Sequence, residues 1–160
     1  MNRPAIMLSL CAALCVGALP ALAQPVVSYV KSGARFDDVR DDLKQAIESR
    51  GLVVDYQSHI GRMLERTGKD VGSTKPLYAD AQSLQFCSAQ LSRKTMEADA
   101  ANVVMCPYTI VVYATAARPD QVVVAYRRPM RQGGSPASRA ALREVDALMD
   151  GIAREAAGRK

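Results

Sequence analysis

Residues 86–113, FCSAQLSRKTMEADAANVVMCPYTIVVY, contain the features that decide the fold. The branched and aromatic side chains of residues 108–113 give the strongest strand signal in the chain. A shorter run of the same kind ends at Cys87, and residues 89–98 between the two runs have the pattern of a short helix. Cys87 and Cys106 therefore lie at the edges of two predicted strands.

The rest of the chain supplies further strands and two long helices. The run that ends at Cys87 begins at Leu84, and similar runs predict three other strands over residues 26–30, 52–56 and 122–126. Apolar side chains recur every three or four residues after Phe36 and after Pro136, which predicts amphipathic helices ending near Gly51 and near Gly158. A short helix over residues 60–67 and a loop over residues 68–76 are also expected.

This order of elements predicts a single α+β domain. The segment Arg118-Pro119-Asp120 is typical of a turn, so the strands on either side of it are expected to form an antiparallel hairpin. Two long amphipathic helices need one apolar surface, which a single mostly antiparallel sheet provides when both helices pack on one face. Residues 122–125 are apolar at successive positions, so both faces of that strand need cover, and a homodimer would provide it.

The N-terminus has the organisation of a secretory signal peptide. One positive charge at Arg3 precedes an apolar run, and Ala21-Leu22-Ala23 supplies the small residues of a cleavage site. A membrane anchor is the alternative, but the run covers only about 17 residues and ends at Pro20, which is short for a spanning helix. We expect residues 1–23 to be removed, which leaves no stable anchor and one domain over residues 24–160, periplasmic or secreted.

The charge of the mature chain argues against a nucleic-acid partner. Removal of Arg3 leaves 20 basic and 16 acidic residues, a net charge of +4. This excess is mild, and the chain has no Trp and few aromatic residues on which bases could stack. A small ligand or another envelope protein is the expected partner.

The sequence resembles the DUF302 family over about residues 26–155. The similarity lies in Phe86-Cys87-Ser88, in Met96-Glu97-Ala98-Asp99 and in Cys106-Pro107-Tyr108 leading into the strongest strand. The chain looks like the exported subgroup, in which Cys-Pro-Tyr precedes the fourth strand. This resemblance implies a β-α-β(4)-α fold similar to TATA-binding-protein-like domains, often dimeric, with no agreed activity.

Three interpretations of Cys87 and Cys106 follow from the sequence. An oxidising compartment favours a structural disulfide, which would stabilise the fold by about 3 kcal/mol for the loop between them. Two free buried thiols are the second interpretation, and a redox or metal-binding role is the third. The spacing is far from Cys-x-x-Cys, which argues against a thioredoxin-type site.

His59 is the only histidine, and it is a candidate ligand-binding residue. Together with Met63, Met96, Met105 and the two sulfurs it suggests a soft-metal site for Cu(I) or a haem iron. Methionines more often fill cores, so we expect no cofactor.

The other candidate ligand-binding residues are Arg127 and Arg128, which follow the last predicted strand, and Tyr108 of the Cys-Pro-Tyr motif. Converging guanidinium groups could hold an anionic small molecule, although exposed arginines are usually just solvated. Further arginines follow these two at positions 131, 139 and 143.

No catalytic set is evident in the sequence. The serines have only His59 as a conceivable base, and paired carboxylates occur only on the first long helix. We therefore expect a non-catalytic periplasmic domain that binds a small ligand or a protein partner. A thiol- or metal-dependent redox component of the cell envelope is the alternative.

Overall fold

The computed structural model describes residues 26–159, so the predicted signal peptide, residues 1–23, lies outside the described residues. The elements in chain order are β1 Val26–Ser32, α1 Phe36–Glu48, β2 Val54–His59, α2 Ile60–Thr67, β3 Tyr78–Phe86, α3 Ala89–Ala98, the 3-10 helix η1 Ala100–Met105, β4 Tyr108–Thr115, β5 Arg118–Arg127 and α4 Pro136–Ala156. Within residues 26–159, no helix is both long and apolar enough to cross a membrane.

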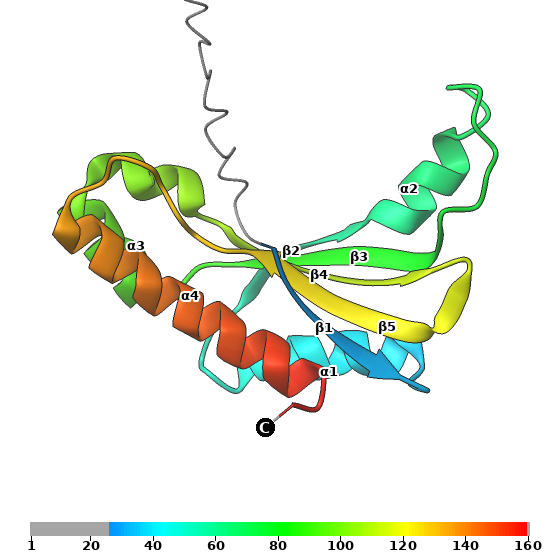
Figure 1. Ribbon diagram of the computed structural model, residues 1–160, viewed down its shortest axis with the longest axis horizontal. Helices are drawn as coiled ribbons and strands as arrows, with labels where there is room; N and C mark the ends of the chain where they lie inside the picture. The colour runs from blue at the N-terminus through cyan, green and yellow to red at the C-terminus, as the bar shows by residue number, and fades with distance from the viewer. Residues whose placement is uncertain (1–25, 160) are drawn as a thin grey trace, which may run out of the picture.

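The strands form one antiparallel sheet in the order β1-β5-β4-β3-β2. Strands β2 to β5 follow one another as a meander, and β1 pairs with β5 at the far edge. Because β1 and β2 occupy opposite edges, α1 passes beneath the sheet between them (Figure 1). The predicted α+β, β-α-β(4)-α fold with a single antiparallel sheet is confirmed.

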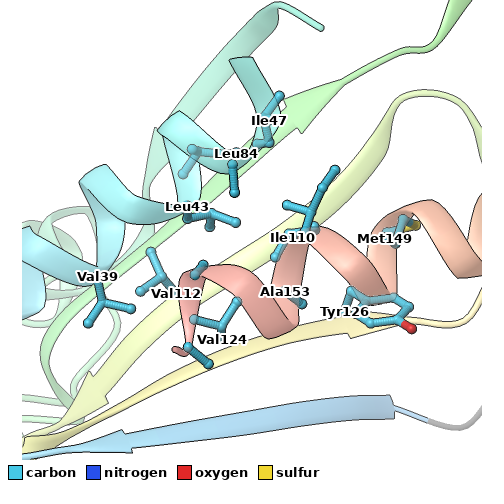
Figure 2. Close-up of a cluster of buried hydrophobic side chains, with 14 of the residues drawn as sticks. Val39, Leu43, Ile47, Leu84, Ile110, Val112, Val124, Tyr126, Met149 and Ala153 are labelled. Atoms are coloured by element: carbon cyan, nitrogen blue, oxygen red, sulfur yellow. The ribbon is translucent and has the colours of Figure 1, made fainter. Parts of the chain in front are cut away.

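Both long helices pack on the same face of the sheet, as the sequence predicted (Figure 1). Strand β4 alternates strictly between buried and half-buried side chains, so every second residue faces the helices. Figure 2 shows side chains of α1 and α4 meeting those of the sheet: Val39, Leu43, Ile47, Met149 and Ala153 from the helices, and Leu84, Ile110, Val112, Val124 and Tyr126 from the strands.

The opposite face of the sheet is only partly covered. Helix α2 lies against β3 on the side away from α1 and α4 (Figure 1). The approach is close, because a Cβ atom added at Gly61 would lie 2.9 Å from the backbone nitrogen of Ala81. Val111 and Val123 of this face stay half-buried, and a homodimer that covers them remains a prediction.

Several predicted boundaries were wrong. Strand β3 begins at Tyr78, well before the predicted start at Leu84, because pairing with β4 continues along its polar first half. Arg118-Pro119-Asp120 belongs to β5, and the turn falls on the two alanines before it. Pro119 is tolerated there because the first residues of β5 have a strand on one side only. Helix η1 was not predicted.

Candidate functional site

Cys87 and Cys106 form a disulfide at one end of the sheet. Cys87 directly follows β3, Cys106 stands two residues before β4, and their Cα atoms lie 6.4 Å apart. The strands are neighbours, and the pairing of Phe86 with Tyr108 brings the residues beyond them together. The predicted pairing of the cysteines is confirmed, and the bond closes the segment that contains α3 and η1.

Tyr108 connects the disulfide to the core. Its ring is 2% exposed and meets the ring of Phe86 edge-on, with the centroids 5.9 Å apart. Its hydroxyl lies 3.2 Å from the Ser92 hydroxyl, which in turn lies 3.7 Å from Cys106 Sγ. Burial raises the pKa of Tyr108, and the hydrogen bond with Ser92 only partly opposes this effect. The phenol therefore acts as a neutral packing and hydrogen-bonding group.

A cavity of about 490 Å³ lies beside the disulfide, at the end of the sheet where β4 begins and β5 ends. We call it the sheet-end cavity. Most of its walls are apolar. The lining residues come from β1, η1, the link between η1 and β4, β4, β5, the segment after β5 and α4: Val26, Val104, Met105, Pro107, Tyr108, Thr109, Val111, Ala125, Tyr126, Arg127, Arg128, Pro129 and Met149. Val26 and Val104 are 64% and 71% exposed, which marks the cavity as an apolar recess open to solvent.

Of the candidate arginines, Arg127 and Arg128 line this cavity. The Arg128 guanidinium lies 2.8 Å from a carboxylate oxygen of Asp146 on α4, so its charge is largely balanced. Arg127 is exposed and makes no ion pair with any residue in the described range 26–159. It therefore supplies the one unbalanced positive charge at the rim.

The other three arginines do not converge on the cavity. Arg131 pairs with Asp99, and the Arg139 side chain donates to the carbonyl oxygen of Gly134. Both interactions hold the segment between β5 and α4 in place. Arg143 is exposed on α4 and does not line the cavity. The predicted cluster of guanidinium groups thus reduces to Arg127 and Arg128.

A polar network behind the cavity was missed by sequence reasoning. The hydroxyls of Tyr29 and Tyr126 both donate to Asp150 Oδ1, at 2.5 and 3.3 Å, and Tyr126 also donates to Asp146. Burial alone would raise the pKa of Asp150, but hydrogen bonds from Tyr29 and Arg154 outweigh it and lower that pKa. The sequence did contain a signal for this network, because Asp146 and Asp150 are four residues apart and therefore lie on the same side of α4, next to its apolar stripe.

His59 lies far from this site. It is exposed, ends β2 and pairs with Gln82, five positions along β3 from Cys87, which corresponds to about 16 Å. Met63 lies on α2, which packs against the first half of β3, so His59 and Met63 stand away from the end of that strand where the cysteine sulfurs lie. Among the described residues 26–159, no three His, Cys, Asp or Glu side chains gather as a metal site would require.

These features define an α+β domain with its two long helices on one sheet face, and with a disulfide and an open recess at one end of that sheet. The family model described as "Domain of unknown function DUF302" matches residues 28–156, and the chain belongs to this family.

A crystal structure described as uncharacterized conserved protein DUF302 from Bacillus stearothermophilus has the same fold. The TM-score is 0.65 at 14% sequence identity, over 81% of this chain and 97% of that chain. No curated protein matches the sequence.

Proposed function

We propose that this protein is an exported, non-catalytic binding domain whose sheet-end cavity takes a small molecule with an apolar body and one acidic group. The sequence of residues 1–23 supports export to the periplasm or beyond. A disulfide between Cys87 and Cys106 suits an oxidising compartment.

The walls of the cavity carry the proposal. Small-molecule sites usually have about 300–1,000 Å³ of mostly apolar space with a few polar groups, and this cavity has about 490 Å³. Met105, Val111 and Met149 offer apolar contact. The unbalanced guanidinium of Arg127 can hold a carboxylate through two parallel hydrogen bonds.

The disulfide supports one wall of this cavity. Met105 and Pro107 line it and stand on either side of Cys106, whose sulfur is tied to the end of β3. A wall held in place before the ligand arrives costs less ordering entropy on binding. The disulfide therefore helps to preform the proposed binding site.

Calorimetric titration of the mature chain, residues 24–160, with decanoate and with decanol tests the proposal. We expect decanoate to bind and decanol, which lacks the charge, to bind more weakly. Arg127→Gln is expected to weaken decanoate binding by about tenfold, since a hydrogen bond to a charged group contributes about 1.5–3 kcal/mol and the rim is solvated.

Arg118→Gln is the matched control, because Arg118 is exposed at the opposite end of β5. This variant should bind decanoate as the unaltered protein does. Absence of decanoate binding, or an equal loss in both variants, would count against a small acidic ligand and favour the protein partner that the sequence also allows.

A further inference from the structure

Helix α2 and the loop after it form an arm, residues 60–77, that projects from the sheet on the side away from α1 and α4 (Figure 1). The helix is amphipathic in sequence, yet none of its residues is fully buried. Met63, Val71 and Leu77 are 42%, 73% and 50% exposed, so the arm presents apolar side chains that the domain itself leaves uncovered.

The charge of the arm is also unbalanced. Residues 60–77 contain four basic and two acidic side chains. Within the described residues, Arg62, Lys69 and Lys75 make no ion pair. Elsewhere most basic side chains do pair, as Arg50 does with Glu155.

Three of these cations line one cavity. It has about 600 Å³ and lies between α2, the loop and the start of β3, where Arg62, Lys69 and Lys75 contribute to its walls. Two carboxylates, Glu65 and Asp80, also line it. Three cations therefore face two carboxylates, and the walls of this cavity carry one positive charge in excess.

Tight backbone contacts hold the arm in shape. Gly61 sits directly against β3, with no room for a larger residue beside Ala81. At the other end of α2, the Ser73 nitrogen donates to the Gly68 carbonyl oxygen over 2.8 Å, which folds the loop back on the helix. The cavity is therefore formed before anything binds.

We propose that the arm binds the surface of an anionic membrane. A lipid phosphate would occupy the cavity between Arg62, Lys69 and Lys75, while Val71 and Leu77 contact the acyl region. Basic groups combined with exposed apolar side chains are what peripheral membrane segments use. The arm stands at the opposite end of β3 from the sheet-end cavity, so both sites can be occupied together.

Sedimentation of the mature chain with vesicles tests this proposal. Vesicles of equal parts phosphatidylglycerol and phosphatidylcholine should bind the protein at least tenfold more strongly than pure phosphatidylcholine vesicles, and added salt should weaken the binding. The triple variant Arg62→Gln/Lys69→Gln/Lys75→Gln should lower the partition coefficient about a hundredfold, at about fivefold for each basic group near an anionic surface. Val71→Ser should lower it several-fold.

The triple variant Arg35→Gln/Arg118→Gln/Arg143→Gln is the matched control, since it removes the same charge from exposed positions outside the arm. It should retain most of the binding. Equal losses in the two triple variants, or no preference for phosphatidylglycerol, would overturn the proposal. Displacement of the protein from vesicles by micromolar glycerol phosphate would also overturn it, because the site would then belong to a small phosphorylated molecule.

Discussion

Replacing both Cys87 and Cys106 by alanine is expected to lower the free energy of unfolding by about 3 kcal/mol. The two residues are 19 positions apart in sequence. Closing a loop of this length removes conformational entropy from the unfolded chain that corresponds to about 3 kcal/mol at 25 °C. For a domain of this size the melting temperature should fall by about 10 °C.

The fold should nevertheless survive the loss of the bond, because other contacts hold the same segment. Asn102 of η1 is fully buried, and its amide donates to the Thr95 carbonyl oxygen and to the Ser138 hydroxyl, both at 2.8 Å. Lys94 of α3 pairs with Glu144 of α4. A loss of about 3 kcal/mol also leaves a typical domain, with about 5–15 kcal/mol in total, folded.

Urea unfolding followed by circular dichroism measures the effect in the oxidised protein, the reduced protein and the double variant. The last two should have the same midpoint, and reductant should not change the double variant further. An unchanged midpoint in the double variant would refute the entropy argument. Loss of thiol exchange or of metal uptake in folded Cys87→Ser or Cys106→Ser protein would instead favour the redox alternative.

Four further predictions concern the core, two ionisable groups and the open sheet face. Leu43→Ala should cost about 2–5 kcal/mol in urea unfolding because Leu43 is completely buried, whereas exposed Gln45→Ala should cost little. The folded protein lowers the pKa of Asp150, so the carboxylate contributes fully to the free energy of unfolding above its usual pKa of 3.8, and this contribution is lost as the pH falls further. The free energy of unfolding should therefore fall in acid, and it should fall less in Asp150→Asn. The raised pKa of Tyr126, due first to burial and then to Asp146, means that stability should also fall as the pH rises above 10, which alkaline denaturation measures. If the chain is a homodimer through the open face, Val111→Glu should halve its mass in sedimentation equilibrium, and a monomeric unaltered protein would contradict that expectation.

Local patterns of the chain were enough to predict its five strands, its α-helices and its layers, although not the 3-10 helix η1. The run of branched and aromatic residues after Tyr108 and the helical periodicity around Leu43 each involve neighbours within a few residues, so both patterns can be recognised without knowing the fold. The start of α4 is another local feature, since Ser135 accepts a hydrogen bond from the Ser138 nitrogen and Pro136 takes the first helical position.

The tertiary structure alone decided which distant groups meet. Tyr29 contacts Asp150 only because β1 pairs with β5, and no local pattern near either residue specifies that partnership. The same register places Val26 beside Arg127 at the rim of the sheet-end cavity. Residues about a hundred positions apart come into contact because both long helices bury their apolar faces against the whole sheet. That burial involves the complete core, so no single stretch of the sequence specifies it.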